Sequence, residues 1–138
     1  MCLIAKNKNP LIAEDDIVCY KLLVQTTYRG EYRTPYKIMY LDNKIIQGEK
    51  NLVAKGSEGI EPLCTPDRYK ITGGFIHCYT DHEVATNCAD IIDIKCFIYV
   101  TVFECIIPKG TAYYKGNNWD ICAKEIKLVK KVYATKHF

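Results

Sequence analysis

The order of apolar and polar residues along the chain predicts short β-strands more often than helices. Residues 95–107 form a long run rich in β-branched and aromatic residues, which ends at a Pro-Lys-Gly turn. Residues 17–24 form a shorter apolar run that favours a central strand, and residues 125–132 alternate like a half-exposed strand. Further strands are predicted at residues 36–40, 44–47, 51–54 and 111–115, and two short strands or one bent strand at 69–79 around Gly73-Gly74.

One segment has the period of a helix. Thr80 and Glu83 are spaced like a capping box, and apolar residues follow at intervals of three and four, namely Val84, Ala85, Cys88, Ala89 and Ile92. This pattern predicts a helix over residues 81–92. The whole pattern predicts an α+β fold that is mainly antiparallel β-sheet with one clear short helix.

The length and composition indicate a single globular domain. The 138 residues are 49% hydrophobic and 25% charged, a balance typical of a chain that folds without a partner. We expect a lead-in segment at residues 1–16, a core at 17–133 and a tail at 134–138. Residues 26–34 are mostly polar, contain Gly30 and are followed by Pro35, so they are interpreted as a surface loop. Residues 56–66 show no period and fit either a functional loop or a plain connection.

Charge and cysteine content restrict the function classes. The net charge of +3 is spread along the chain, apart from four lysines between residues 124 and 131, so there is no strong nucleic-acid signal. The first residues lack the apolar stretch of a signal peptide, and no segment predicts a membrane span, so we expect a cytoplasmic protein. The eight cysteines form no C-x-x-C pair and are interpreted as buried free thiols in a reducing compartment.

Two other uses of the cysteines stay open at this point. Distant cysteines together with His77 or His82 could form a zinc site, although metal sites usually show one close pair of ligands. Removal of Met1 would expose Cys2 as an N-terminal nucleophile, although enzymes of that kind are larger and usually have glycine where this chain has Leu3.

Glu104 is the most informative single residue. On the predicted strand it shares a face with Cys96, Ile98, Val100, Val102 and Ile106, and a carboxylate on an apolar face is costly unless it is paired or lies at an opening. Two interpretations follow. Glu104 either borders a functional cleft, or it faces solvent near Pro108 or pairs with a lysine.

The segment that contains Glu104 resembles part of a known family. Residues 104–114, Glu-Cys-Ile-Ile-Pro-Lys-Gly-Thr-Ala-Tyr-Tyr, are similar to the strand and turn that carry the catalytic glutamate of ADP-ribosyltransferases. Residues 74–78, Gly-Phe-Ile-His-Cys, are similar to a stretch of a small bacterial family with an ADP-ribosyltransferase-like fold. Residues 18–21, Val-Cys-Tyr-Lys, occupy the place of the family's first NAD-contacting residue, so the resemblance covers about three short segments. It implies that fold for this chain, with NAD as a substrate or ligand rather than a bound cofactor.

The resemblance also implies roles for individual residues. Glu104 and His77 would be catalytic, with Glu104 holding a ribose hydroxyl and favouring a positively charged transition state. Tyr20, Lys21 and Phe75 would contact the nucleotide. The chain departs from the family in three places. It has Tyr20-Lys21 where arginine-using members have arginine, Phe75-Ile76-His77 where they have Ser-Thr-Ser, and Val102 where a Glu or Gln selects the acceptor. These departures put transfer chemistry in doubt.

Purely structural roles are the alternative for some of these residues. His77 lies between Ile76 and Cys78 and could be a satisfied core residue, and Tyr28, Tyr32, Tyr36 and Tyr40 could either pack over a sheet or form a contact surface. The sequence therefore leaves two functions. The first is binding of NAD or an ADP-ribose-like nucleotide in a cleft, with residual ADP-ribosyl transfer left open. The second is a non-catalytic structural or interaction module, for example a phage or mobile-element protein that assembles with itself or binds a host or virion component.

Overall fold

The computed structural model describes residues 3–25, 32–33, 44–45, 51–54, 58–96 and 99–135. Within these ranges the chain forms one helix and thirteen strands, so the predicted α+β class dominated by antiparallel sheet is confirmed. The elements are β1 (Leu3–Ala5), β2 (Leu11–Ile12), β3 (Ile17–Gln25), β4 (Tyr32–Arg33), β5 (Lys44–Ile45), β6 (Asn51–Val53), β7 (Gly59–Pro62), β8 (Tyr69–Gly73), β9 (Ile76–Tyr79), α1 (His82–Cys96), β10 (Tyr99–Ile107), β11 (Ala112–Lys115), β12 (Asp120–Ala123) and β13 (Glu125–Ala134).

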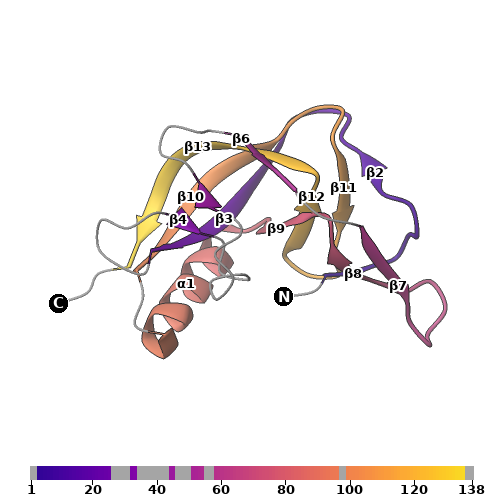
Figure 1. Ribbon diagram of the computed structural model, residues 1–138, viewed down its shortest axis with the longest axis horizontal. Helices are drawn as coiled ribbons and strands as arrows, with labels where there is room; N and C mark the ends of the chain where they lie inside the picture. The colour runs from indigo at the N-terminus through magenta and orange to yellow at the C-terminus, as the bar shows by residue number, and fades with distance from the viewer. Residues whose placement is uncertain are drawn as a thin grey trace.

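The described strands belong to two antiparallel sheets (Figure 1). The large sheet has the order β2-β11-β12-β9-β3-β10-β13-β6, and β4 pairs with both β3 and β5. The small sheet has the order β1-β8-β7. The two long strands β3 and β10 are paired along their whole length, from Tyr99 opposite Gln25 to Ile107 opposite Ile17, and they form the centre of the large sheet.

Successive side chains of β3 and β10 point to opposite faces of the sheet, and each face packs into a different cluster. The inner face packs against β12, β13 and the end of β2. We name these buried residues the inner cluster: Ala13, Cys19, Leu23, Cys78, Phe103, Cys105, Ile107, Ile121, Ala123 and Ile126.

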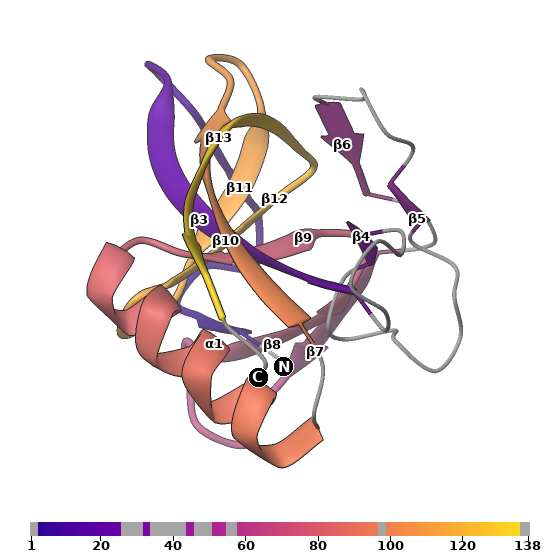
Figure 2. The ribbon, with the colours of Figure 1, turned by 90° about the vertical axis from the view of Figure 1, so that its left-hand side faces the viewer.

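The outer face of β3 and β10 is covered at one end by α1, as Figure 2 shows. The buried residues there form the helix-side cluster: Leu22, Val24, Ala85, Ala89, Val100 and Val102. Asp81 caps the helix, because its Oδ1 accepts a hydrogen bond of 3.0 Å from the Val84 N–H. The predicted cap at Thr80 is therefore wrong by one residue. At the other end of the helix-side surface, the Tyr133 hydroxyl donates a hydrogen bond to Asp90 Oδ1.

The small sheet packs on the remaining part of the large one. Its buried residues, the small-sheet cluster, are Leu3, Ala5, Ile71, Phe75, Tyr114 and Cys122. The two glycines predicted to separate strands do so, since β8 ends at Gly73 and β9 begins at Ile76. Gly74 has a φ of 77°, and a Cβ there would lie 2.8 Å from the Glu58 Cα, so only glycine fits this turn.

Several predicted boundaries are wrong. The lead-in at residues 1–16 contains β1 and β2, the loop at 26–34 contains β4, the aperiodic stretch at 56–66 contains β7, and β12 was not predicted. These strands have two to four residues, too few to show a period. Strands β1 and β2 form by pairing with partners distant in sequence, whereas β7 and β12 pair with their neighbours β8 and β11. The strand predicted at 36–40 and three of the four periodic tyrosines, Tyr28, Tyr36 and Tyr40, lie outside the described residues.

The boundary between helix and strand also moved. Helix α1 continues to Cys96, so Lys95 and Cys96 belong to the helix and β10 begins only at Tyr99. Cys96 follows Ile92 by four residues, which extends the helical spacing beyond the predicted end at residue 92. Cys96 therefore does not share a strand face with Glu104.

Candidate functional site

Two of the five predicted site residues, Glu104 and Tyr20, lie side by side on the outer face of the large sheet. They are registered partners across β10 and β3, and Tyr20 is in turn paired with Tyr79 on β9. The Tyr20 ring also makes an edge contact with the His82 imidazole, with centroids 5.4 Å apart. This row crosses the sheet where α1 begins, so Glu104 lies just beyond the surface that the helix covers.

Glu104 has an ordinary ion-pair partner in this position. Lys130, its registered neighbour on β13, places Nζ 3.9 Å from Glu104 Oε2, and 65% of the Lys130 side chain is exposed. Val18, on the same outer face of β3, is 51% exposed. The outer face therefore turns to solvent toward Pro108. Both parts of the structural interpretation of Glu104, a solvent-facing position and a lysine partner, are present.

Substituting Glu104 tests whether its carboxylate lowers the stability of the folded protein. We expect Glu104→Gln to change the free energy of unfolding by less than about 1 kcal/mol in denaturant titrations, because a partly exposed ion pair contributes little. Lys130→Gln is the matched control and should behave alike, with little further loss in the double variant. A clear gain in stability for Glu104→Gln alone would instead indicate a carboxylate held at energetic cost, as in a catalytic site.

His77 lies on the same outer face, two residues before Tyr79 on β9, and it is half-buried. Its registered partner is Cys122 of the small-sheet cluster, whereas Tyr79 packs on the helix-side cluster, so His77 lies at the junction of the two. Burial and then the positive charge of Lys21 lower the pKa of His77 to about 4. The imidazole is therefore neutral at pH 7. Tyr20 and Tyr79 lie between His77 and Glu104 in the strand register.

Lys21 belongs to the inner face and is only 6% exposed. Its Nζ donates a hydrogen bond of 2.7 Å to the His77 carbonyl oxygen, close to the point where the pairing of β3 and β9 stops after Tyr20 and Tyr79. Burial lowers the pKa of Lys21. The neighbouring groups of Cys78, Cys105 and Cys19 act in the opposite direction and raise it, but burial has the larger effect. The lysine thus joins two strands inside the protein and is not presented to a ligand.

The three thiols beside Lys21 are buried, and the Cys105 thiol donates a hydrogen bond of 3.4 Å to the Phe103 carbonyl oxygen. Cys19 lies opposite Cys105 across β3 and β10. Hydrogen bonds with Cys105 and Cys78, together with burial, raise the pKa of Cys19, whereas the hydrogen bond from Cys19 and the charge of Lys21 lower that of Cys78. Cys19, Cys64, Cys78, Cys88, Cys105 and Cys122 are all free thiols. Among the described residues, no three His, Cys, Asp or Glu side chains are arranged to hold a metal ion.

Phe75 packs in the small-sheet cluster, away from Glu104. Its ring meets that of Tyr114 edge-on, with centroids 5.1 Å apart, and Lys124 Nζ lies 4.5 Å from its centroid. Lys124 is also ion-paired with Glu58 at 2.6 Å. These contacts assign Phe75 a packing role in the small-sheet cluster.

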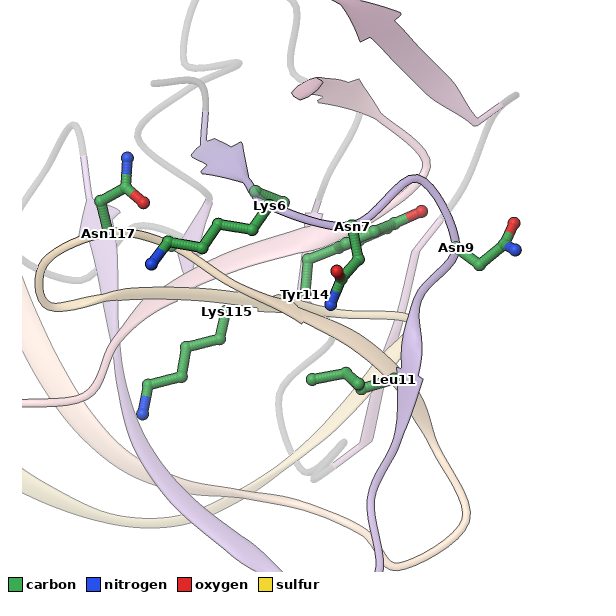
Figure 3. A pocket seen from close by; sticks show the side chains of 9 residues that line it. Lys6, Asn7, Asn9, Leu11, Tyr114, Lys115 and Asn117 are labelled. Atoms are coloured by element: carbon green, nitrogen blue, oxygen red, sulfur yellow. The ribbon is translucent and has the colours of Figure 1, made fainter. Parts of the chain in front are cut away.

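An open pocket of about 290 Å³ lies elsewhere, between the N-terminal segment and the turn from β11 to β12. None of the five predicted site residues lines it. Its described lining residues are Ala5, Lys6, Asn7, Asn9, Leu11, Tyr114, Lys115, Gly116 and Asn117. Figure 3 shows the Lys6 and Lys115 side chains, which come from two different segments, extending in the same direction.

Both segments that form the pocket are fixed to the folded core. The Tyr114 hydroxyl donates a hydrogen bond of 2.6 Å to the Lys8 carbonyl oxygen, which ties the N-terminal segment to β11. The Gly116 N–H donates to the Asp120 carbonyl oxygen at 2.9 Å, which closes the turn. A Cβ on Gly116 would lie 2.9 Å from Asp120 Cγ, so the turn needs glycine to pack this closely.

The lining favours an anionic ligand. Two lysines supply positive charge, three asparagines supply amide donors and acceptors, and Leu11 supplies apolar surface. None of the described lining residues carries a carboxylate. The sequence signal for this site is the pair of similar stretches Lys6-Asn7-Lys8-Asn9 and Lys115-Gly116-Asn117-Asn118, which the sequence interpretation treated only as a lead-in and a turn.

Comparisons of the chain with protein-family models, curated proteins and solved structures found no match. The resemblance of about three short segments to ADP-ribosyltransferases stays a prediction from the sequence. In the described part of the chain, no helix combines the length and the apolar character needed to cross a membrane.

Proposed function

We propose that this protein binds a nucleotide-like phosphorylated small molecule in the pocket between residues 5–11 and 114–117. The observation that carries the proposal is that Lys6 and Lys115 both line the pocket and extend in the same direction, while none of the described lining residues carries a carboxylate. An ammonium group is a point charge that suits the several oxygens of a phosphate. The asparagine amides are suited to sugar hydroxyls or base edges, and Leu11 to an apolar ring face.

The volume of the pocket limits the size of the ligand. At about 290 Å³ it lies at the lower end of ordinary small-molecule sites. One nucleotide unit or a sugar phosphate matches this volume, whereas a dinucleotide such as NAD would extend beyond it. We therefore expect one phosphate-bearing half of an ADP-ribose-like ligand to occupy the pocket.

The proposal is for binding without group transfer. The described lining contains no acid, histidine or thiol that could move a proton or stabilise a sugar cation. The alternative location around Glu104 has less support, because Glu104 is paired with Lys130, and Lys21 and Phe75 pack inside the protein. The resemblance to ADP-ribosyltransferases supports ADP-ribose and NAD as the first ligands to test.

The test is the thermal unfolding midpoint with and without millimolar AMP, ADP-ribose, NAD or inorganic phosphate. A ligand that binds only the folded state raises the midpoint, and we expect about 2.7 kcal/mol of stabilisation when its concentration is a hundred times Kd. Lys6→Gln and Lys115→Gln should each abolish the rise. High salt should reduce it, because the attraction between charges is screened.

Two control variants locate the site. Lys127→Gln removes an exposed lysine on β13 and should keep the full ligand effect. Glu104→Ala should keep it too, whereas its loss in this variant alone would return the site to the Glu104 region. No rise with any of the four ligands would overturn the proposal.

A further inference from the structure

A second feature of the N-terminal segment concerns the free edge of the large sheet. Strand β2 is the last strand of the sheet, and among the described residues it pairs only with β11. Figure 1 shows it at the outer end of the molecule. Both of its side chains are exposed, Leu11 by 43% and Ile12 by 58%. An apolar edge strand is a template for pairing with another chain.

The hydrogen bonds of the neighbouring residue show which backbone groups face outward. The Ala13 N–H donates to the Thr111 carbonyl oxygen at 3.0 Å, and the Ala13 carbonyl oxygen accepts from the Gly110 N–H at 2.8 Å. The backbone groups of Ala13 therefore face β11. Because successive residues of a strand alternate, the N–H and C=O of Ile12 face away from β11, toward the open edge.

The charges on either side of β2 are arranged to match a copy of themselves. Lys6 and Lys8 precede the strand, and Glu14, Asp15 and Asp16 follow it, all with exposed side chains. When two such segments run antiparallel, the lysine end of each lies beside the carboxylate end of the other. Opposite charges on neighbouring strands stabilise the pairing.

We propose that β2 pairs antiparallel with β2 of a second copy of this chain, with Ile12 opposite Ile12 on a two-fold axis. The two Ile12 residues exchange both backbone hydrogen bonds, and their side chains cover each other. Pro10 is compatible with this register, because its missing N–H requires no partner and its carbonyl oxygen can still accept a hydrogen bond. The same residues serve in both chains, as a two-fold interface requires.

Such a short pairing forms a weak dimer, whose fraction grows with protein concentration. The inference goes beyond ligand binding and does not depend on it, because it rests on Ile12, Lys8 and the carboxylates after β2, none of which lines the pocket; Lys6 and Leu11 are shared by the two surfaces. It also gives a specific partner to the module function that the sequence leaves open.

Sedimentation velocity from micromolar to millimolar protein tests the proposal. The parent protein should shift from monomer toward dimer. Ile12→Lys should raise the dissociation constant by about tenfold or more, because two lysines would then lie directly opposite each other across the axis. Val18→Lys is the matched control, since Val18 is similarly exposed but lies on the outer sheet face, and it should dimerise like the parent.

Charge reversal adds a second arm. Lys8→Glu should weaken the dimer. Combining it with Glu14→Lys should restore it, because in this register Glu14 of the second copy lies on the same face as residue 8 and diagonally across from it, so the complementary arrangement is rebuilt with opposite signs. A parent protein that stays monomeric throughout, or an Ile12→Lys variant that dimerises normally, would overturn the proposal. Equal weakening by Val18→Lys would also overturn it and would assign the interface to the outer face.

Discussion

Truncation of Tyr114 to alanine is expected to lower the free energy of unfolding by about 3 to 5 kcal/mol, the usual cost of removing a buried aromatic side chain. Tyr114 is among the largest fully buried side chains, and its ring packs edge-on against Phe75 in the small-sheet cluster. Its hydroxyl also holds the N-terminal segment at Lys8. The loss therefore combines a cavity with a released segment, and urea titration measures it.

Tyr114→Phe separates these two contributions. The ring is retained, so only the hydrogen bond to the Lys8 carbonyl oxygen is lost, at a cost of about 1 kcal/mol. The N-terminal segment forms one wall of the ligand pocket, and this hydrogen bond holds it. Tyr114→Phe should therefore reduce the ligand-induced rise in unfolding midpoint by a larger fraction than it reduces the free energy of unfolding without ligand. Equal stability losses for the two variants would contradict the packing role assigned to the ring.

Acidification is expected to destabilise the protein through His77 by about 3 kcal/mol between pH 6.5 and pH 4, because its pKa falls from 6.5 to about 4 on folding. The unfolded chain takes up this proton more readily than the folded one. The contribution of His77 to stability is therefore complete above pH 6.5, and it is lost as the pH falls through the folded-state pKa. The cause is burial, followed by the charge of Lys21.

The measurement is the free energy of unfolding against pH for the parent protein and for His77→Gln, which cannot be protonated in this range. Carboxylates titrate alike in both proteins, so the difference between the two curves isolates His77. His82→Gln is the control, since His82 is exposed in the first turn of α1, and it should follow the parent. Parallel curves for the parent and His77→Gln would show that His77 is not held neutral by burial.

These experiments also decide between the two interpretations of His77 that the sequence leaves open. A residue buried neutral between two packed clusters has a structural role, and its substitution should change acid stability without changing ligand binding. A ligand-contacting histidine should change both.

The sequence by itself determined the class of the fold and most of its long elements. The β-branched run that forms β10, the apolar run that forms β3 and the alternating polar and apolar residues of β13 carry their period in the chain itself, because each has one or two faces to bury. The helix was found for the same reason, although its end was placed four residues too early. The turn at Gly73-Gly74 needs a backbone conformation that only glycine adopts readily.

Only the tertiary structure decided how the candidate residues are grouped. Tyr20 and Lys21 are adjacent in sequence, yet strand alternation sends them to opposite faces, and the sequence does not say which face is closed. Glu104 is paired because the register places Lys130 beside it, a long-range fact that no local pattern contains. The pocket likewise depends on long-range contacts, since the pairing of β2 with β11 and the hydrogen bond from Tyr114 to Lys8 bring Lys6 and Lys115 together from distant parts of the chain.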